Sequence, residues 1–202
     1  MPGQALVNQV KTLPADDVFR LYLKLLTDAK DKAQIAALAL RDKARAGELN
    51  ENVVPLLDAC LSAAPDEPSL MHLAKALAAF GRRAQGASAT LAERIYELSV
   101  IDDLSFWHLD GCLWASGYLG GDPAKRLLEK LEAEEPPRVL RSDSVYEGRL
   151  SAEDRQQRFA ATLKGVRELI AAEDPGAWRE KKSDLQAVAA KRSPRKAPWS
   201  VR

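Results

Sequence analysis

An internal repeat constrains this chain of 202 residues more than any other feature of its sequence. The segment SLMHLAKALAAFG, residues 69–81, aligns without a gap on SFWHLDGCLWASG, residues 105–117, at an offset of 36 residues. The register continues downstream, where Leu91 aligns with Leu127. A repeat of this length is typical of a small unit that cannot bury its own apolar face and becomes stable only when copies stack side by side.

Both copies have the apolar spacing of helices, and the composition agrees, because the chain contains 33 Ala and 29 Leu, which are strong helix formers. Gly81 and Gly117, aligned by the repeat, are predicted to end the first helix of each pair. No segment has the alternation of a strand. We therefore predict an all-α fold, a right-handed stack of antiparallel helix pairs. Helices are expected to begin near Pro14, Lys30, Asn50, Pro68, Thr90, either Asp103 or Ser105, Asp122, Ser151 and Asp174.

The chain divides into a helical repeat domain and a basic tail. The domain is expected to span residues 1–178, with its clearest repeats at 69–103 and 105–135 and a loop without periodicity at 135–150. The tail, residues 179–202, has eight basic and two acidic residues and so a net charge of +6, which leaves −5 for the remainder. Such a tail lacks the apolar content to fold alone, and we expect it to be flexible.

One stretch of the second copy resembles a known repeat family. The sequence ASGYLGGDPAKRLLEKL, residues 115–131, is similar to the short bacterial type of HEAT repeat, in which a small-residue helix ends in a Leu-Gly turn before a leucine-spaced second helix. The matching residues are Gly117, Leu119, Gly120, Asp122, Ala124, Leu128 and Leu131. The resemblance implies an α-solenoid. A period of 36 residues is also close to that of a tetratricopeptide repeat, so both subclasses stay open.

The helix that begins near Ser105 is apolar on two sides. Besides its core stripe it carries a ridge of Trp107, Gly111, Trp114 and Tyr118, and the aligned ridge of the preceding copy carries Lys75 and Arg82. Because Trp, Tyr and Arg dominate binding hot spots, this surface is a candidate for docking another protein. The alternative is that a later helix, bearing Phe159 and Leu163, covers the ridge. The candidate partner-binding residues are Trp107, Trp114, Tyr118, Lys75 and Arg82.

The basic tail suggests a second kind of contact. Clustered cations beside a single tryptophan suit either a recognition peptide or an electrostatic tether to an acidic protein or a nucleic acid. The candidate contact residues in the tail are Lys191, Arg192, Arg195, Lys196 and Trp199. Nucleic acid is the second choice of partner, because the domain itself is net acidic and offers no basic stripe.

No catalytic motif is present in the sequence. It lacks a nucleophile elbow, a phosphate-binding glycine loop and an HExxH segment. His72 and His108 occupy equivalent repeat positions, with Cys112 one turn after His108, but no carboxylate completes a metal site. Some HEAT-like hydroxylases bind iron through His-Glu dipeptides, whereas here leucine follows each histidine. We predict no catalytic residues, no cofactor and no metal; a small HEAT-like enzyme is the rival class.

Taken together, these patterns indicate a non-enzymatic protein–protein interaction module, such as an adaptor, a scaffold or an inhibitor-like or immunity-like partner. Its ligand is expected to be another protein. No apolar run is long enough to span a bilayer, and the first residues lack the pattern of a secretory signal. Cys60 and Cys112 fall in apolar helical patterns that suit free thiols, so a cytoplasmic location is expected.

Overall fold

The computed structural model describes residues 2–100, 105–133 and 151–177. Within these ranges the regular structure is entirely helical and contains no strand, so the prediction of an all-α fold is confirmed. Short 3-10 helices, η1 (Lys30–Lys32), η2 (Glu51–Val53) and η3 (Gly81–Ala87), precede α3, α4 and α6. The α-helices are α1 (Pro2–Thr12), α2 (Ala15–Asp28), α3 (Ala33–Arg45), α4 (Val54–Ser62), α5 (Glu67–Ala78), α6 (Ser88–Ser99), α7 (Phe106–Leu119), α8 (Gly121–Ala133) and α9 (Ala152–Ala171).

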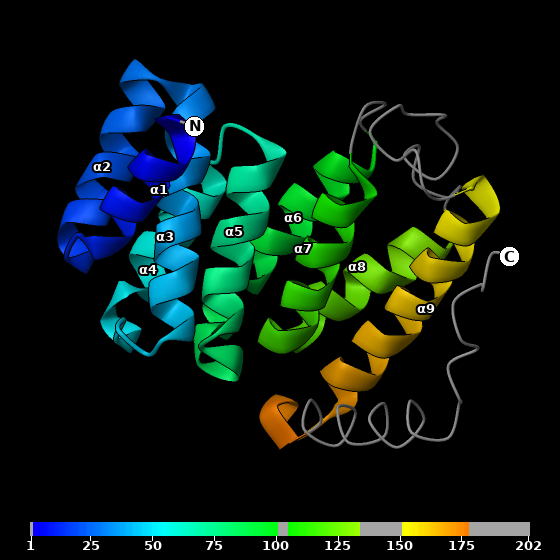
Figure 1. Cartoon of the computed structure of the whole chain (residues 1–202). Helices are drawn as coiled ribbons and strands as arrows, with labels where there is room; N and C mark the ends of the chain where they lie inside the picture. The colour runs from blue at the N-terminus through cyan, green and yellow to red at the C-terminus, as the bar shows by residue number, and fades with distance from the viewer. Residues whose placement is uncertain (1, 101–104, 134–150, 178–202) are drawn as a thin grey trace, which may run out of the picture.

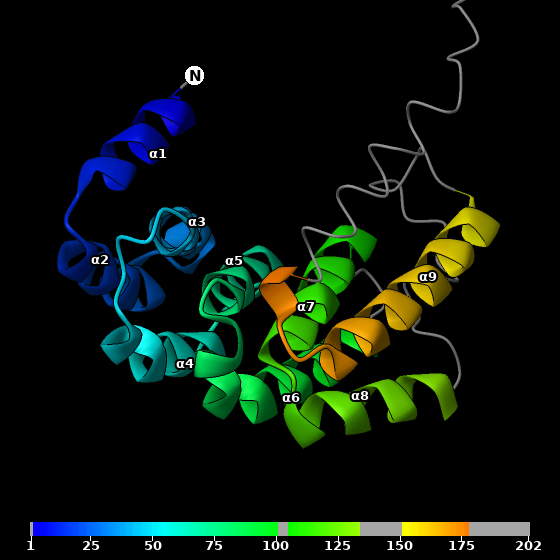
Figure 2. The same ribbon diagram turned by 90° about the horizontal axis from the view of Figure 1, so that it is seen from below.

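The helices form two layers that follow chain order. An inner layer contains α3, α5, α7 and α9, each packed against the next, and an outer layer contains α2, α4, α6 and α8 (Figure 2). Each outer helix packs against the inner helix that follows it, as α4 does on α5 and α6 on α7. The row of inner helices bends, with α1 and α9 rising at its two ends (Figure 2). This sequential packing is consistent with a stacked helical arrangement.

Neighbouring helices of the inner layer run in the same direction, as copies in a stack must. Near the starts of α5 and α7, Glu67 Oε2 lies 3.1 Å from His108 Nδ1. Just beyond the end of α5, Arg82 Nη1 donates to Gly117 O, near the end of α7, at 3.1 Å. The colour gradient in Figure 1 shows the same direction for α3 and α9. The connections between inner helices therefore return through the outer layer.

The repeat register places its apolar residues in equivalent core positions. Leu73 on α5 and its counterpart Leu109 on α7 are both fully buried, and so are Leu77 and its counterpart Leu113. Between the two layers, however, α5 packs on α4 more than on α6, and α7 packs on α6 more than on α8. The packed pairs are therefore displaced by one helix from the sequence units 69–103 and 105–135.

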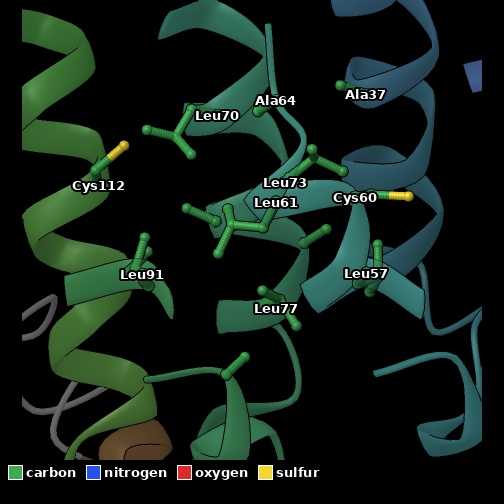
Figure 3. Packing of buried hydrophobic residues seen from close by; sticks show 14 of the residues in the cluster. Ala37, Leu57, Cys60, Leu61, Ala64, Leu70, Leu73, Leu77, Leu91 and Cys112 are labelled. Atoms are coloured by element: carbon green, nitrogen blue, oxygen red, sulfur yellow. The ribbon is translucent and has the colours of Figure 1, made fainter. Parts of the chain in front are cut away.

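The hydrophobic core lies between the two layers (Figure 3). Leu70, Leu73 and Leu77 of α5 reach it from the inner layer and meet Leu61 of α4 and Leu91 of α6, and each of these five side chains is fully buried. Burial of one such leucine contributes about 1.5–3 kcal/mol relative to its exposure. The alanine-rich positions between them allow the helices to approach closely, because each adds only a methyl group to the interface.

The two glycines aligned by the repeat have different roles. Gly81 lies just after α5 with a φ of 58°, in the left-handed region that favours glycine. Gly117 instead lies inside α7, which continues to Leu119 and is capped by Gly120 with a φ of 66°. The prediction that Gly117 ends this helix is therefore wrong. A Cβ at Gly117 would lie 2.9 Å from Leu169 Cδ2, so this glycine gives α9 room to pack on α7.

Helix starts and ends follow local signals in several places. α9 begins with a capping box, in which the Ser151 hydroxyl accepts from the Asp154 amide and the Asp154 carboxylate accepts from the Ser151 amide. α1 was not among the expected helices; it packs on α3 and buries Val10.

None of the helices in the described ranges has both the length and the apolar composition that a membrane crossing requires.

Candidate functional site

A row of polar side chains crosses the inner face of the stack, the side of α3, α5 and α7 that is turned away from the outer layer. On α5 the core residues Leu73 and Leu77 are fully buried, whereas His72 and Lys75 are only half-buried and lie on other faces of the helix. The row connects α1 to α9 through side chains of all the inner helices. We call it the inner-face row; its members are Lys11, Arg41, Asp42, His72, Lys75, Asp110 and Thr162.

The row begins with a three-residue ion cluster between α1 and α3. Lys11 Nζ lies 2.7 Å from Asp42 Oδ2, and Arg41 donates to Asp42 Oδ1 from Nε at 2.9 Å and from Nη2 at 2.6 Å. Partial burial raises the pKa of the Asp42 carboxyl, but the hydrogen bonds and positive charges of Lys11 and Arg41 outweigh it, and the pKa is lowered. Asp42 is thus ionised and fully engaged at neutral pH.

His72 continues the row on α5. Arg41 Nη1 lies 3.2 Å from His72 Nδ1. Burial, together with the positive charges of Arg41 and Lys75, lowers the pKa of His72 to about 4. The ring is therefore neutral near pH 7, and because guanidinium only donates, His72 Nδ1 must be the acceptor. The neutral imidazole therefore carries its proton on Nε2 and adds no positive charge to the row.

The Lys75 side chain extends from α5 towards α7 and lies against Gly111. A Cβ added at Gly111 would lie 3.0 Å from Lys75 Cε and 2.9 Å from Met71 Cγ. Any larger residue would displace these side chains, so Gly111 creates the space in which Lys75 lies. The Lys75 ammonium is half-buried, and within the described ranges it donates one hydrogen bond, to the Met71 thioether at 3.3 Å. Burial and the nearby Arg41 lower the pKa of Lys75.

The row ends between α7 and α9 at a half-buried carboxylate, that of Asp110. Thr162 Oγ1 donates to Asp110 Oδ1 at 2.5 Å. Burial raises the pKa of Asp110, although the hydrogen bonds from Thr162 and Trp114 and the charge of Lys75 act in the opposite direction. The hydrogen bond from Thr162 fixes the Asp110 carboxyl beside α9.

The structure splits the aromatic ridge predicted from sequence. Trp107 is 51% exposed, with the Arg158 guanidinium 5.3 Å from its ring centre. Trp114 is half-buried and packs so closely on α9 that a Cβ at Gly165 would overlap its ring. Tyr118 is half-buried. The helix that bears Phe159 and Leu163 is α9, so the covering helix expected as the alternative reaches Trp114 but leaves Trp107 open.

Arg82, the second basic candidate, is occupied within the fold. Its guanidinium reaches past Gly120 and donates to backbone carbonyls at the ends of α7 and α9. The acceptors are Gly117 O, Leu169 O, Ile170 O and Ala172 O, at 2.9–3.3 Å. Lys75, by contrast, donates to no oxygen atom among the residues that the structure describes. The tail residues Lys191, Arg192, Arg195, Lys196 and Trp199 lie outside the described residues.

The two histidines have separate partners despite their equivalent repeat positions. His72 contacts Arg41, whereas His108 Nδ1 lies 3.1 Å from Glu67 Oε2. Cys112 is fully buried, and burial raises its pKa to about 12. Among the residues that the structure describes, no three His, Cys, Asp or Glu side chains are grouped in a way that would hold a metal ion.

Several members of the row were not predicted from the sequence. Arg41, Asp110 and Thr162 are ordinary polar residues of amphipathic helices, and nothing in their local spacing shows that they meet. Gly111 was a detectable signal, because a glycine in the middle of a helix costs about 1 kcal/mol relative to alanine and often marks a close approach. Its alignment with Lys75 in the repeat also pointed to a difference between the two copies.

A second concave feature lies between α8 and α9. This pocket has a volume of about 250 Å³ and a mostly apolar wall. The polar residues that line it are exposed at its rim, so the pocket does not indicate the chemical class of a ligand. Its lining residues are Lys125, Leu128, Glu129, Arg167, Ile170 and Ala171.

Comparison with known proteins adds no relative to this description. No protein-family model, no curated protein and no solved structure matches the chain.

Proposed function

We propose that this protein is a non-enzymatic protein–protein interaction module that binds its partner on the inner face of the helical stack. The observation that carries the proposal is Trp107, which is 51% exposed beside the inner-face row and has Arg158 against its ring. An exposed tryptophan next to prearranged charges has the composition of a binding hot spot. An adaptor, a scaffold and an inhibitor-like or immunity-like protein would all use such a rigid surface.

The proposal includes a finer assignment of the fold. We infer that the stack is a right-handed α-solenoid, HEAT-like or tetratricopeptide-like, in which repeats line a continuous inner surface. The parallel inner helices and the core leucines shared by residues 69–81 and 105–117 support it. Solenoids of this kind present extended concave faces to their ligands.

Cys60 and Cys112 are free, buried thiols on different helices, which supports a cytoplasmic location (Figure 3).

Affinity purification tests the proposal. The full chain carrying a tag would be expressed in its native cell, and captured proteins would be quantified for the wild type and for Trp107→Ala. We expect at least one partner whose capture falls about tenfold or more in the variant, as hot-spot truncations do. Leu23→Ala, at a 48% exposed leucine of the outer-layer helix α2, is the matched control and should capture normally. Equal capture by wild type and Trp107→Ala would refute the role of this face.

The basic tail supports one competing function, nucleic-acid binding, through the net charge of +6 on residues 179–202. The two functions differ in their response to salt. Nucleic-acid affinity would fall steeply with ionic strength for random-sequence DNA or RNA, and a chain ending at residue 178 would lose it. Protein capture through Trp107 would persist in that shortened chain.

A further inference from the structure

Lys75 is a half-buried cation that has no oxygen acceptor among the described residues of the inner-face row. Its ammonium can donate three hydrogen bonds, and the one it makes within the described ranges goes to the Met71 sulfur, a weak acceptor. Asp110 acts on it electrostatically, but the two do not form an ion pair among the described residues. Holding an ammonium partly out of water without an oxygen acceptor is unfavourable, and an incoming anion would relieve that cost.

Arg45 brings a second unused cation to the same place. It follows Arg41 by one helical turn on α3, and Lys75 follows His72 by one turn on α5. Because Arg41 contacts His72 and the two helices run in the same direction, Arg45 lies on the side of α3 that faces Lys75. Within the described ranges Arg45 is exposed and makes no ion pair or side-chain hydrogen bond. Its charge also lowers the pKa of Lys75, as expected for close cations.

The carboxylates that flank this pair are already engaged. Asp42 accepts from Lys11 and from Arg41, and Asp110 accepts from Thr162. Neither carboxylate forms an ion pair with Lys75 or Arg45 among the residues that the structure describes. The middle of the inner-face row therefore carries an excess of positive charge, between the Lys11–Asp42–Arg41 cluster on one side and the Asp110 carboxyl on the other.

From this juxtaposition we propose that Lys75 and Arg45 form an anion subsite that receives a carboxylate from an acidic peptide segment of the partner protein, while Trp107 takes an apolar side chain of the same segment. This inference deepens the proposed function and rests on it. Lys75 supplies the directional donors, and Arg45 supplies additional charge at the edge of the subsite.

Charge complementarity favours a peptide over a nucleic acid. A polyanionic backbone would have to extend beyond this small positive centre onto the rest of the domain. The domain as a whole has a net charge of −5, which also opposes a polyanion. A peptide can place one or two carboxylates between neutral residues and so match a small positive centre within a mixed surface.

A peptide selection tests the inference even though the partner is unidentified. The full chain would be immobilised and used to select from a random peptide library displayed on phage, in parallel with a Lys75→Gln, Arg45→Gln double variant. We expect the wild type to enrich peptides rich in Asp and Glu, and the double variant to lose that enrichment. A selected peptide, labelled for fluorescence anisotropy, should bind about tenfold more weakly to Lys75→Gln and about threefold more weakly to Arg45→Gln.

Control variants separate the alternatives. Lys75→Arg should restore most of the affinity, whereas Lys24→Gln and Arg126→Gln, at exposed cations of the outer-layer helices α2 and α8, should leave it unchanged. Absence of acidic enrichment, or equal enrichment by the double variant, overturns the inference. If selected peptides are not acidic but depend on Trp107, the proposed function stands and the anion subsite falls. If a labelled oligothymidylate binds in a Lys75-dependent manner and no acidic peptides are selected, the inference is overturned and the ligand of the subsite is a nucleic acid.

Discussion

A methyl group added at Gly120 tests how the last two inner helices are joined. Gly120 has φ 66° and ψ −153°, a conformation that is essentially restricted to glycine. A Cβ at this position would overlap the Nη1 and Cζ atoms of Arg82, far inside van der Waals contact. The Gly120→Ala variant must therefore strain its backbone and also expel the Arg82 guanidinium from its place between α7 and α9.

The expected cost has two parts. The backbone conformation contributes about 1–3 kcal/mol. Displacement of Arg82 removes hydrogen bonds to carbonyls of both helices, and because the guanidinium is partly exposed to water we assign these about 1–2 kcal/mol in total. The free energy of unfolding of Gly120→Ala should thus fall by about 2–5 kcal/mol, which is a large fraction of the stability of a typical domain.

Urea unfolding followed by the helical circular dichroism signal measures this cost, and a double-mutant cycle separates its parts. In an Arg82→Ala background the methyl group at position 120 has no guanidinium to displace, so only the backbone strain remains. The two substitutions should therefore be less than additive, by about 1–2 kcal/mol. Gly81→Ala is the matched control, because Gly81 has a φ of 58° but nothing within 4 Å of its added Cβ. Full additivity, or equal costs at both glycines, would refute the reasoning.

Three further outcomes follow from the same contacts. The pKa of His72 is lowered from 6.5 to about 4, so the ring stays unprotonated in the folded chain while the unfolded chain binds a proton, and the free energy of unfolding should decline by up to about 2 kcal/mol as the pH falls from 6.5 to 4. In His72→Gln the midpoint of urea unfolding should depend less on pH over that range. The same pH dependence in the variant and the wild type would contradict the assignment. Trp114→Ala should lower stability by about 2–4 kcal/mol and Trp107→Ala by less than about 1 kcal/mol, as thermal melts would show; similar losses would place both in the core. Cys60 and Cys112, with pKa values raised to about 11 and about 12 by burial, should resist a thiol reagent at pH 8 until urea unfolds the chain; rapid native labelling would contradict their burial.

The layered helical architecture was accessible from the sequence because it depends on features that repeat. Leu73 and Leu77 recur as Leu109 and Leu113, and a regular apolar pattern predicts a regular packed layer. α1 was missed from the sequence, although Val10 on this helix is buried in the core. The role of Gly117 was misread because glycine both ends helices and admits close neighbours, and local sequence does not distinguish the two.

The candidate site was less accessible because its members belong to different helices. Arg41 and His72 are 31 residues apart, and Asp110 and Thr162 are 52 apart. Each looks like one more polar residue on an exposed helix face until the layers are assembled. Arg82 was predicted from the sequence as a partner contact, and its contacts within the fold were not: it donates to backbone carbonyls of α7 and α9.

The copies share core leucines but differ at several positions on the inner face, and some of the differing positions fit one another. Lys75 of α5 aligns with Gly111 of α7, and the absence of a side chain at Gly111 is what lets Lys75 lie across α7. Met71 aligns with Trp107 in the same way, one half-buried beneath Lys75 and the other open to solvent. A chain in which both copies were made identical would keep the core leucines and hence the stack, but it would lose the free ammonium or the exposed tryptophan. The inner-face row therefore depends on the positions at which the two copies differ, and the surface that we propose binds a partner lies at these positions.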